Sequence, residues 1–123
     1  MNQNAEKLDT CQLEQMLNGV NRSQVNPIVE ELFRDFAERR TALSDAIENQ
    51  EYETCRIQAH SLKALSQTFG FEGLTQLARK LEEASQARDG EDIVQIASGI
   101  FDLMGSSKEA LRAYLEEKYS DNK

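Results

Sequence analysis

The apolar residues of this 123-residue chain recur at the spacing of an α-helix almost from one end to the other. Between residues 28 and 47, for example, isoleucine, valine, leucine and phenylalanine return every three or four positions. The helix formers Ala, Leu, Glu, Gln, Lys and Arg dominate the composition, and there is one proline and no tryptophan. The chain is therefore expected to adopt an all-α fold.

Start and stop signals divide the pattern into five predicted helices. Asn26-Pro27 provides an N-cap residue and a proline at the first helical position. Gly70 is a C-terminal glycine signal, Asp89-Gly90 is a turn dipeptide, and Gly105-Ser106-Ser107 is a point where the last helix is expected to bend. The helices are expected over about residues 8–19, 27–49, 51–69, 74–88 and 93–115, with residues 21–24 as a linker.

The connections between these predicted helices are short, which favours antiparallel packing of consecutive helices. We therefore predict an antiparallel four-helix bundle with an additional short N-terminal helix. The length fits one domain, covering residues 1–123.

Charge and cysteine content exclude several classes of function. Fourteen Lys and Arg residues against 22 Asp and Glu residues give a formal net charge of −8, which argues against nucleic-acid binding. Cys11 and Cys55 make neither a disulfide framework nor a Cys/His zinc set, so no metal site is expected. The chain shows no signal-peptide pattern and no apolar run of the ~18 residues of a membrane span. A cytoplasmic protein without membrane contact is expected.

His60, the only histidine, lies in the third predicted helix. On a helical wheel with about 100° per residue, the side opposite His60 is a predicted core stripe of Cys55, Ala59, Leu62, Leu65, Ser66 and Phe69. The side within about 60° of His60 carries Glu53, Arg56, Ile57, Lys63, Ala64 and Gln67. The imidazole is therefore expected to point away from the core or to lie at its edge.

Two interpretations of His60 are open. A lone histidine is often an ordinary residue of intermediate burial. Alternatively, its neutral imidazole, abundant near pH 7, serves as a nucleophile. Lys63, one turn along, favours the second interpretation because it can place a positive charge against an added phosphoryl group. Ala64 keeps the surface low enough for another protein's active site to approach, and Ile57 is either a docking contact or a boundary residue.

His60, Leu62, Lys63 and Gly70 match the pattern His-x-Leu-Lys-Gly followed by a helix-ending glycine ten residues after the histidine. The segment 59–70 thereby resembles the signature of histidine-containing phosphotransfer (Hpt) domains. Residues 68–71 are also similar to the first domain of bacterial chemotaxis kinases, and residues 74–82 to the family's next helix. Ala64 departs from the pattern, since most members carry glycine there.

The resemblance implies a phosphorelay intermediate of two-component signalling. His60 would accept a phosphoryl group from a phosphoaspartyl receiver domain or a kinase and pass it to another receiver aspartate. Lys63 would stabilise the phosphoryl charge, and Glu82, which corresponds to the family's Glu or Gln on the following helix, would hydrogen-bond the imidazole. Gln67 and Arg79 are weaker candidates for polar contacts near the phosphoryl group or the docking receiver.

The implied partners are receiver domains of response regulators, a sensor histidine kinase, or both. No cofactor is expected on this chain, and Mg²⁺ is expected on the partner receiver. The nucleotide-binding patterns GxxxxGK[ST] and GxGxxG are absent, so the chain should have no kinase activity of its own. The alternatives are a non-catalytic helical adaptor in which His60 is incidental, and a domain cut from a larger kinase with the same chemistry.

Overall fold

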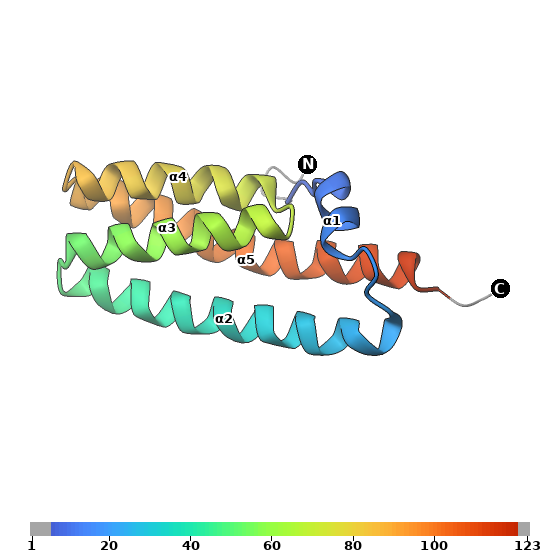
Figure 1. Ribbon diagram of the computed structural model, residues 1–123. Helices are drawn as coiled ribbons and strands as arrows, with labels where there is room; N and C mark the ends of the chain where they lie inside the picture. The colour runs from blue at the N-terminus through green and yellow to red at the C-terminus, as the bar shows by residue number, and fades with distance from the viewer. Residues whose placement is uncertain (1–5, 121–123) are drawn as a thin grey trace.

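The computed structural model describes residues 6–120, and helices make up most of this part of the chain (Figure 1). They are α1 (Thr10–Met16), α2 (Arg22–Glu48), α3 (Tyr52–Thr68), α4 (Glu72–Gln86) and α5 (Gly90–Lys118). Within the described residues there is no β-strand, and Leu8 and Phe71 form only an isolated bridge. The predicted all-α bundle with a short N-terminal helix is confirmed.

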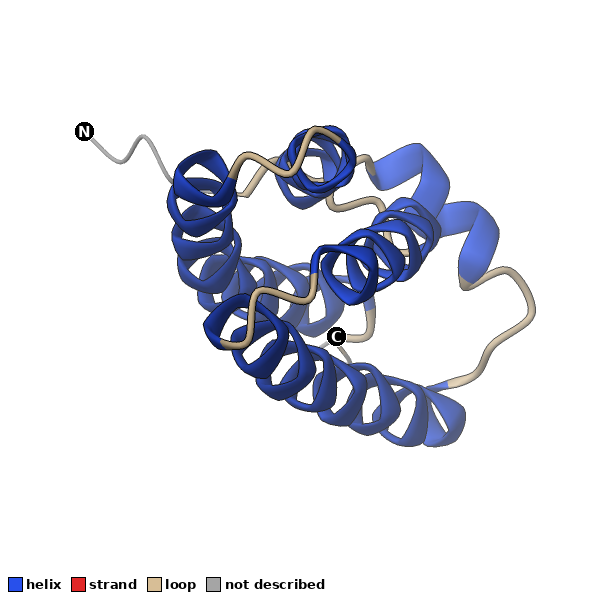
Figure 2. Cartoon of the chain, turned by 90° about the vertical axis from the view of Figure 1, so that its left-hand side faces the viewer, coloured by secondary structure: helices blue, strands red, loops and turns tan. Residues whose placement is uncertain are grey.

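The four long helices run alternately in opposite directions around a shared core (Figures 1 and 2). Each of the four long helices packs against the next long helix along the chain, and α5 also packs against α2, which closes the ring. The short helix α1 packs against α3 and lies across the end of the bundle that carries the α3–α4 turn (Figure 1). Each described helix is too short or too polar to serve as a membrane span.

The core is one apolar cluster to which all five helices contribute. Burying a large apolar side chain stabilises the fold by roughly 1.5–3 kcal/mol. The largest fully buried side chains include Leu13, Leu32, Phe36, Leu43, Leu62, Phe71, Leu74, Leu81, Ile93, Ile100 and Leu111. On α3, the predicted stripe lies inside, with Cys55, Ala59, Leu62, Ser66 and Phe69 buried and Leu65 half-buried.

The start of α2 differs from the prediction. The helix begins at Arg22, five residues before Pro27, and its N-cap is Asn21. The side chain of Gln24 accepts a hydrogen bond of 2.9 Å from the backbone N–H of Asn21. The polar run predicted as a linker is therefore the capped first turn, and Pro27 lies inside α2, where it removes one backbone donor.

The other helix ends follow the signals more closely. Gly70 follows α3 with a φ of 72°, as a C-terminal glycine should. At the α4–α5 connection the left-handed residue is Arg88 with a φ of 57°, whereas Asp89 caps α5 and Gly90 is its first residue. The turn therefore lies at residues 87 and 88, before the predicted dipeptide at residues 89 and 90. The helix α5 continues without interruption through residues 105–107.

An extended segment before α1, residues 6–9, is bound to the α3–α4 turn, and we refer to it as the N-terminal strap. The backbone N–H of Asp9 donates to the carbonyl oxygen of Gly70 over 2.7 Å, and that of Glu72 donates to the carbonyl oxygen of Lys7 over 3.0 Å. These two bonds fix the strap beside the turn.

The first residue of the strap caps a distant helix. The buried carboxylate of Glu6 accepts hydrogen bonds from the backbone N–H groups of Gly73 (2.5 Å) and Leu74 (3.0 Å) and from the hydroxyl of Ser107 (2.9 Å). The N-cap residue of α4, Phe71, has no polar side chain for this purpose. Glu6 therefore satisfies amide groups at the start of a helix that begins more than 60 residues later.

Candidate functional site

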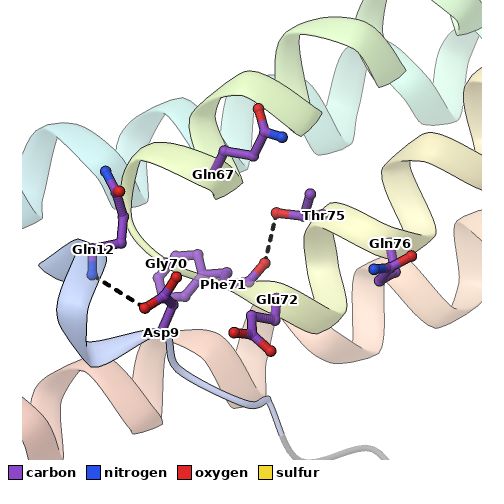
Figure 3. Close-up of a pocket in the computed structure, with 8 residues that line it drawn as sticks. All are labelled: Asp9, Gln12, Gln67, Gly70, Phe71, Glu72, Thr75 and Gln76. Atoms are coloured by element: carbon purple, nitrogen blue, oxygen red, sulfur yellow. Dashed lines mark hydrogen bonds between the residues drawn. The ribbon is translucent and has the colours of Figure 1, made fainter.

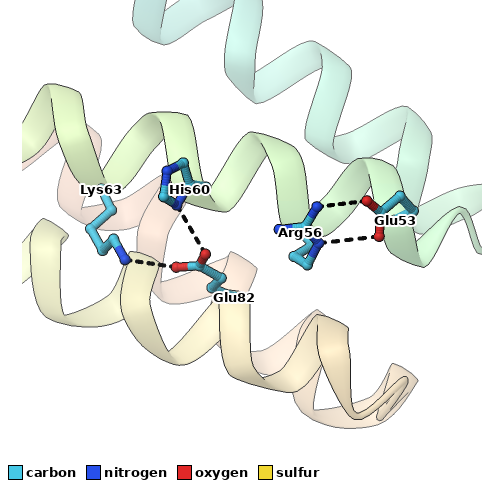
Figure 4. Close-up of polar contacts among 5 residues, drawn as sticks. All are labelled: Glu53, Arg56, His60, Lys63 and Glu82. Carbon is cyan, nitrogen blue, oxygen red and sulfur yellow. Dashed lines mark hydrogen bonds and ion pairs between the residues drawn. The ribbon is translucent and has the colours of Figure 1, made fainter.

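The structure places His60 in the middle of α3 on its outward face. Its neighbours Ala59 and Leu62 are buried in the core, which holds the helix in this rotation. The imidazole side chain is 63% exposed and lies beside α4 (Figure 4). A domain approaching from solvent can therefore reach the ring.

Glu82, on α4, connects the two candidate residues of α3. Its Oε2 atom lies 3.0 Å from Nδ1 of His60, and its Oε1 atom accepts a hydrogen bond of 2.8 Å from Nζ of Lys63 (Figure 4). The Glu82 side chain is only 19% exposed, so one sheltered carboxylate serves both partners. These contacts cross the α3–α4 interface, the most extensive in the bundle.

The electrostatics of this cluster favour an ionised carboxylate. The hydrogen bond from Lys63, aided by the contact with His60 and opposed by desolvation, holds the pKa of Glu82 below its ordinary value. A carboxylate in this position accepts a hydrogen bond from the Nδ1–H group of the neutral imidazole. In that tautomer Nε2 keeps its lone pair, which is the form that a nucleophilic histidine requires.

A second ion pair lies on the same face of α3, one turn before the histidine. Arg56 donates from Nε to Oε1 of Glu53 over 3.1 Å and from Nη2 to Oε2 over 2.6 Å (Figure 4). The guanidinium lowers the pKa of Glu53, and Glu53 raises the pKa of Arg56, with a smaller contribution from Glu82. His60 is thus flanked along α3 by a cation on each side.

The remaining predicted residues are spread over the surface. Ala64 is exposed and Ile57 is 48% exposed, so both lie open on the His60 side of α3. Arg79 is half-buried on α4 and donates to Oε1 of Gln76 over 3.2 Å. The structure therefore brings together His60, Lys63 and Glu82, while Arg79 is bonded to its own helix.

Gln67 belongs to a separate pocket of about 390 Å³ at the α3–α4 turn (Figure 3). The pocket is lined by Asp9, Gln12, Gln67, Gly70, Phe71, Glu72, Thr75 and Gln76. Gln67 lies about two helical turns along α3 from His60, and His60 and Glu82 do not line this pocket. The imidazole, whose side chain is 63% exposed, lies outside this pocket on the surface of α3.

Two features of the site region were not assigned from sequence. Arg56 was on the correct side of the helical wheel, and the i, i+3 spacing of Glu53 and Arg56 was the available signal for their pairing. The capping contact of Glu6 had no local signal, because its partners lie far away in the chain. Among the described residues, no group of three or more His, Cys, Asp or Glu side chains is arranged to hold a metal ion.

Comparison with known protein families supports the relationship that the signature suggested. The Hpt domain family matches residues 27–117, more than half of the chain, and the match includes α3, α4 and the cluster around His60. The comparisons with curated proteins and with solved structures found no match. Hpt domains act in histidine phosphotransfer within two-component phosphorelays. On this evidence the chain belongs to the Hpt domain family.

Proposed function

We propose that this chain is a phosphorelay intermediate that carries a phosphoryl group on Nε2 of His60. The observation that supports the proposal is the cluster itself: an exposed imidazole whose Nδ1 is bonded to a sheltered carboxylate shared with an ammonium group. The proposed donor is either the phosphoaspartate of a receiver domain or, alternatively, a kinase. The proposed acceptor is the aspartate of another receiver.

In the transfer step, the lone pair of Nε2 attacks phosphorus in line with the bond to the aspartate oxygen. The N–P bond forms as the P–O bond breaks, and the aspartate carboxylate leaves with the bonding electrons. The ring then carries a positive charge, which the carboxylate of Glu82 balances through the Nδ1 proton. The reverse reaction onto a second receiver uses the same geometry.

Lys63 and Glu82 have complementary roles in this proposal. Glu82 fixes the orientation and tautomer of His60, and Lys63 places an ammonium beside the position of the phosphoryl oxygens. The chain contributes positioning and charge, and we propose that Mg²⁺ is held by the receiver domain. This division fits phosphoryl transfer, in which catalysis depends mainly on orientation and electrostatic stabilisation.

We further propose that the receiver docks over the outward face of α3. Ile57 and Ala64 lie about one turn to either side of His60 and are exposed. Ile57 offers an apolar contact, and the small side chain of Ala64 allows close approach. Gln67 and Arg79 would lie at the polar margin of this contact, where they could hydrogen-bond the receiver.

The test is a transfer assay with a phosphorylated receiver and Mg²⁺. The wild-type protein should gain a phosphoryl group that is labile in acid and stable in base, and His60→Gln should gain none. Circular dichroism should show that the variant remains folded, since the exposed ring contributes little to the core. Labelling that persists in His60→Gln, or binding of receivers without any transfer, would favour the helical adaptor instead.

A further inference from the structure

We propose that Arg56 is a second phosphoryl-binding cation, which Glu53 holds until the phosphoryl group arrives on His60. The inference rests on the proposed function of His60. It assigns phosphoryl binding to Arg56 and the holding of its guanidinium to Glu53, a residue pair outside the Lys63–Glu82 contact. In this scheme the guanidinium exchanges the carboxylate of Glu53 for the phosphoryl oxygens, and it returns when the group is passed on.

The first argument is the placement of the two cations. Arg56 precedes His60 by four residues and Lys63 follows it by three, so both share its side of the helix. Side chains at these spacings are neighbours, with Cβ atoms about 5–6 Å apart. Figure 4 shows Arg56 and Lys63 on opposite sides of the imidazole along α3. A phosphoryl group on Nε2 would therefore lie between an ammonium and a guanidinium.

The second argument is that Lys63 is already engaged. Its ammonium donates to Glu82 over 2.8 Å, and this carboxylate must remain ionised to hold Nδ1 of His60. The positive charge of Lys63 is thus partly balanced before a phosphoryl dianion is added. A further cation is needed to balance the dianion, and the guanidinium of Arg56 can bind two phosphoryl oxygens in parallel.

The third argument is that the ion pair between Glu53 and Arg56 is weak enough for a phosphoryl group to replace the carboxylate. The Glu53 side chain is 69% exposed and that of Arg56 is 32% exposed, and solvent-exposed ion pairs contribute little to stability. A phosphoryl group carries more negative charge than a carboxylate and offers more acceptor oxygens. The nearby carboxylate of Glu82 also contributes to the raised pKa of Arg56, which indicates that the guanidinium already lies within the field of the His60 cluster.

The experiment measures phosphorylated protein separated from its donor. ³¹P NMR follows the chemical shift of the phosphohistidine as the pH is changed. A cation beside the phosphoryl group lowers the pH at the midpoint of this titration, so Arg56→Ala should raise it. The equilibrium constant for transfer from the receiver should fall by about three- to tenfold in Arg56→Ala. Glu53→Gln should shift both quantities in the opposite direction, and the double variant should behave like Arg56→Ala.

Arg34 and Glu31 provide the matched control. They form an ion pair of 2.8 Å at the same i, i+3 spacing on α2, so Arg34→Ala removes an ion pair of the same spacing from another helix. If phosphorylated wild type is obtained and Arg56→Ala matches Arg34→Ala in both measurements, the role of Arg56 is overturned while the function of His60 stands. If the wild-type protein takes up no phosphoryl group, the proposed function itself fails.

Discussion

The carboxylate of Glu82 shows how one residue can organise a reactive side chain without being the reactive group. Its two oxygens reach different partners, the imidazole of His60 and the ammonium of Lys63, across the interface of two helices. Because the side chain is only 19% exposed, water competes weakly for these contacts. The orientation of the histidine therefore depends on how α3 and α4 are packed.

This contact predicts a pH dependence of stability. The folded-state pKa of Glu82 lies below the ordinary value of 4.5, so its ionised form stabilises the fold above about pH 4.5. That contribution is lost as the pH falls through the lower folded-state value. Glu82→Gln should lower the free energy of unfolding by about 1 kcal/mol near pH 7 and make its acid dependence shallower. Urea denaturation at several pH values measures both effects.

The exposed neighbour Glu83 provides the comparison for this prediction. Glu83→Gln removes the same charge from the same helix without removing the contacts to His60 and Lys63. Equal losses of stability in the two variants would show that the effect comes from net charge alone. The contacts of Glu82 with His60 and Lys63 would then not be its cause.

At the scale of elements, the turn between α3 and α4 is tightly constrained by the N-terminal strap. Gly70 adopts a φ of 72°, and a Cβ atom added there would lie 2.6 Å from the carbonyl oxygen of Asp9. The helix-ending glycine was predictable from the signature, because its conformation is a local requirement. Its second role, to let the strap approach, was not predictable, because it depends on a contact with a distant segment.

Gly70→Ala should therefore cost more stability than a left-handed backbone alone explains. Gly19 is the control, since its φ is 80° but an added Cβ would have no heavy atom within 4 Å. Gly19→Ala should cost about 1 kcal/mol, and Gly70→Ala clearly more, because the backbone of Asp9 must move. Thermal unfolding of the two variants tests this. An equal decrease of Tm in both would show that the strap moves away from residue 70 without loss of stability.

At the scale of the whole molecule, apolar periodicity was sufficient to predict the class of fold and the outward face of α3. The burial of Leu62 and the exposure of His60 follow from the same rotation of one helix. The start of α2 was not predicted, because Pro27 is a stronger local signal than Asn21. In the structure, the contact between Gln24 and the backbone of Asn21 caps the helix five residues before Pro27. Local patterns specify these helices well, whereas the contact of Glu6 at the start of α4 depends on a remote segment.

The separation of core and surface site predicts that stability and transfer can be changed independently. Phe36 is 2% exposed, and the centroid of its ring lies 5.9 Å from the centroid of the Phe71 ring. Phe36→Ala should lower the free energy of unfolding by about 3–5 kcal/mol by leaving a cavity. Well below its reduced Tm, the variant should transfer the phosphoryl group at the wild-type rate per folded molecule. Loss of transfer in fully folded Phe36→Ala would show that the core and the site are coupled.

The capping contact of Glu6 has a practical consequence for protein engineering. The family match begins at residue 27, so a fragment cut at that limit would lack the carboxylate that Gly73, Leu74 and Ser107 bind. It would also lack Leu8, which forms an isolated bridge with the buried residue Phe71. Anyone who transplants this module into a synthetic signalling circuit should carry the preceding twenty or so residues with it, although they lie outside the recognised domain.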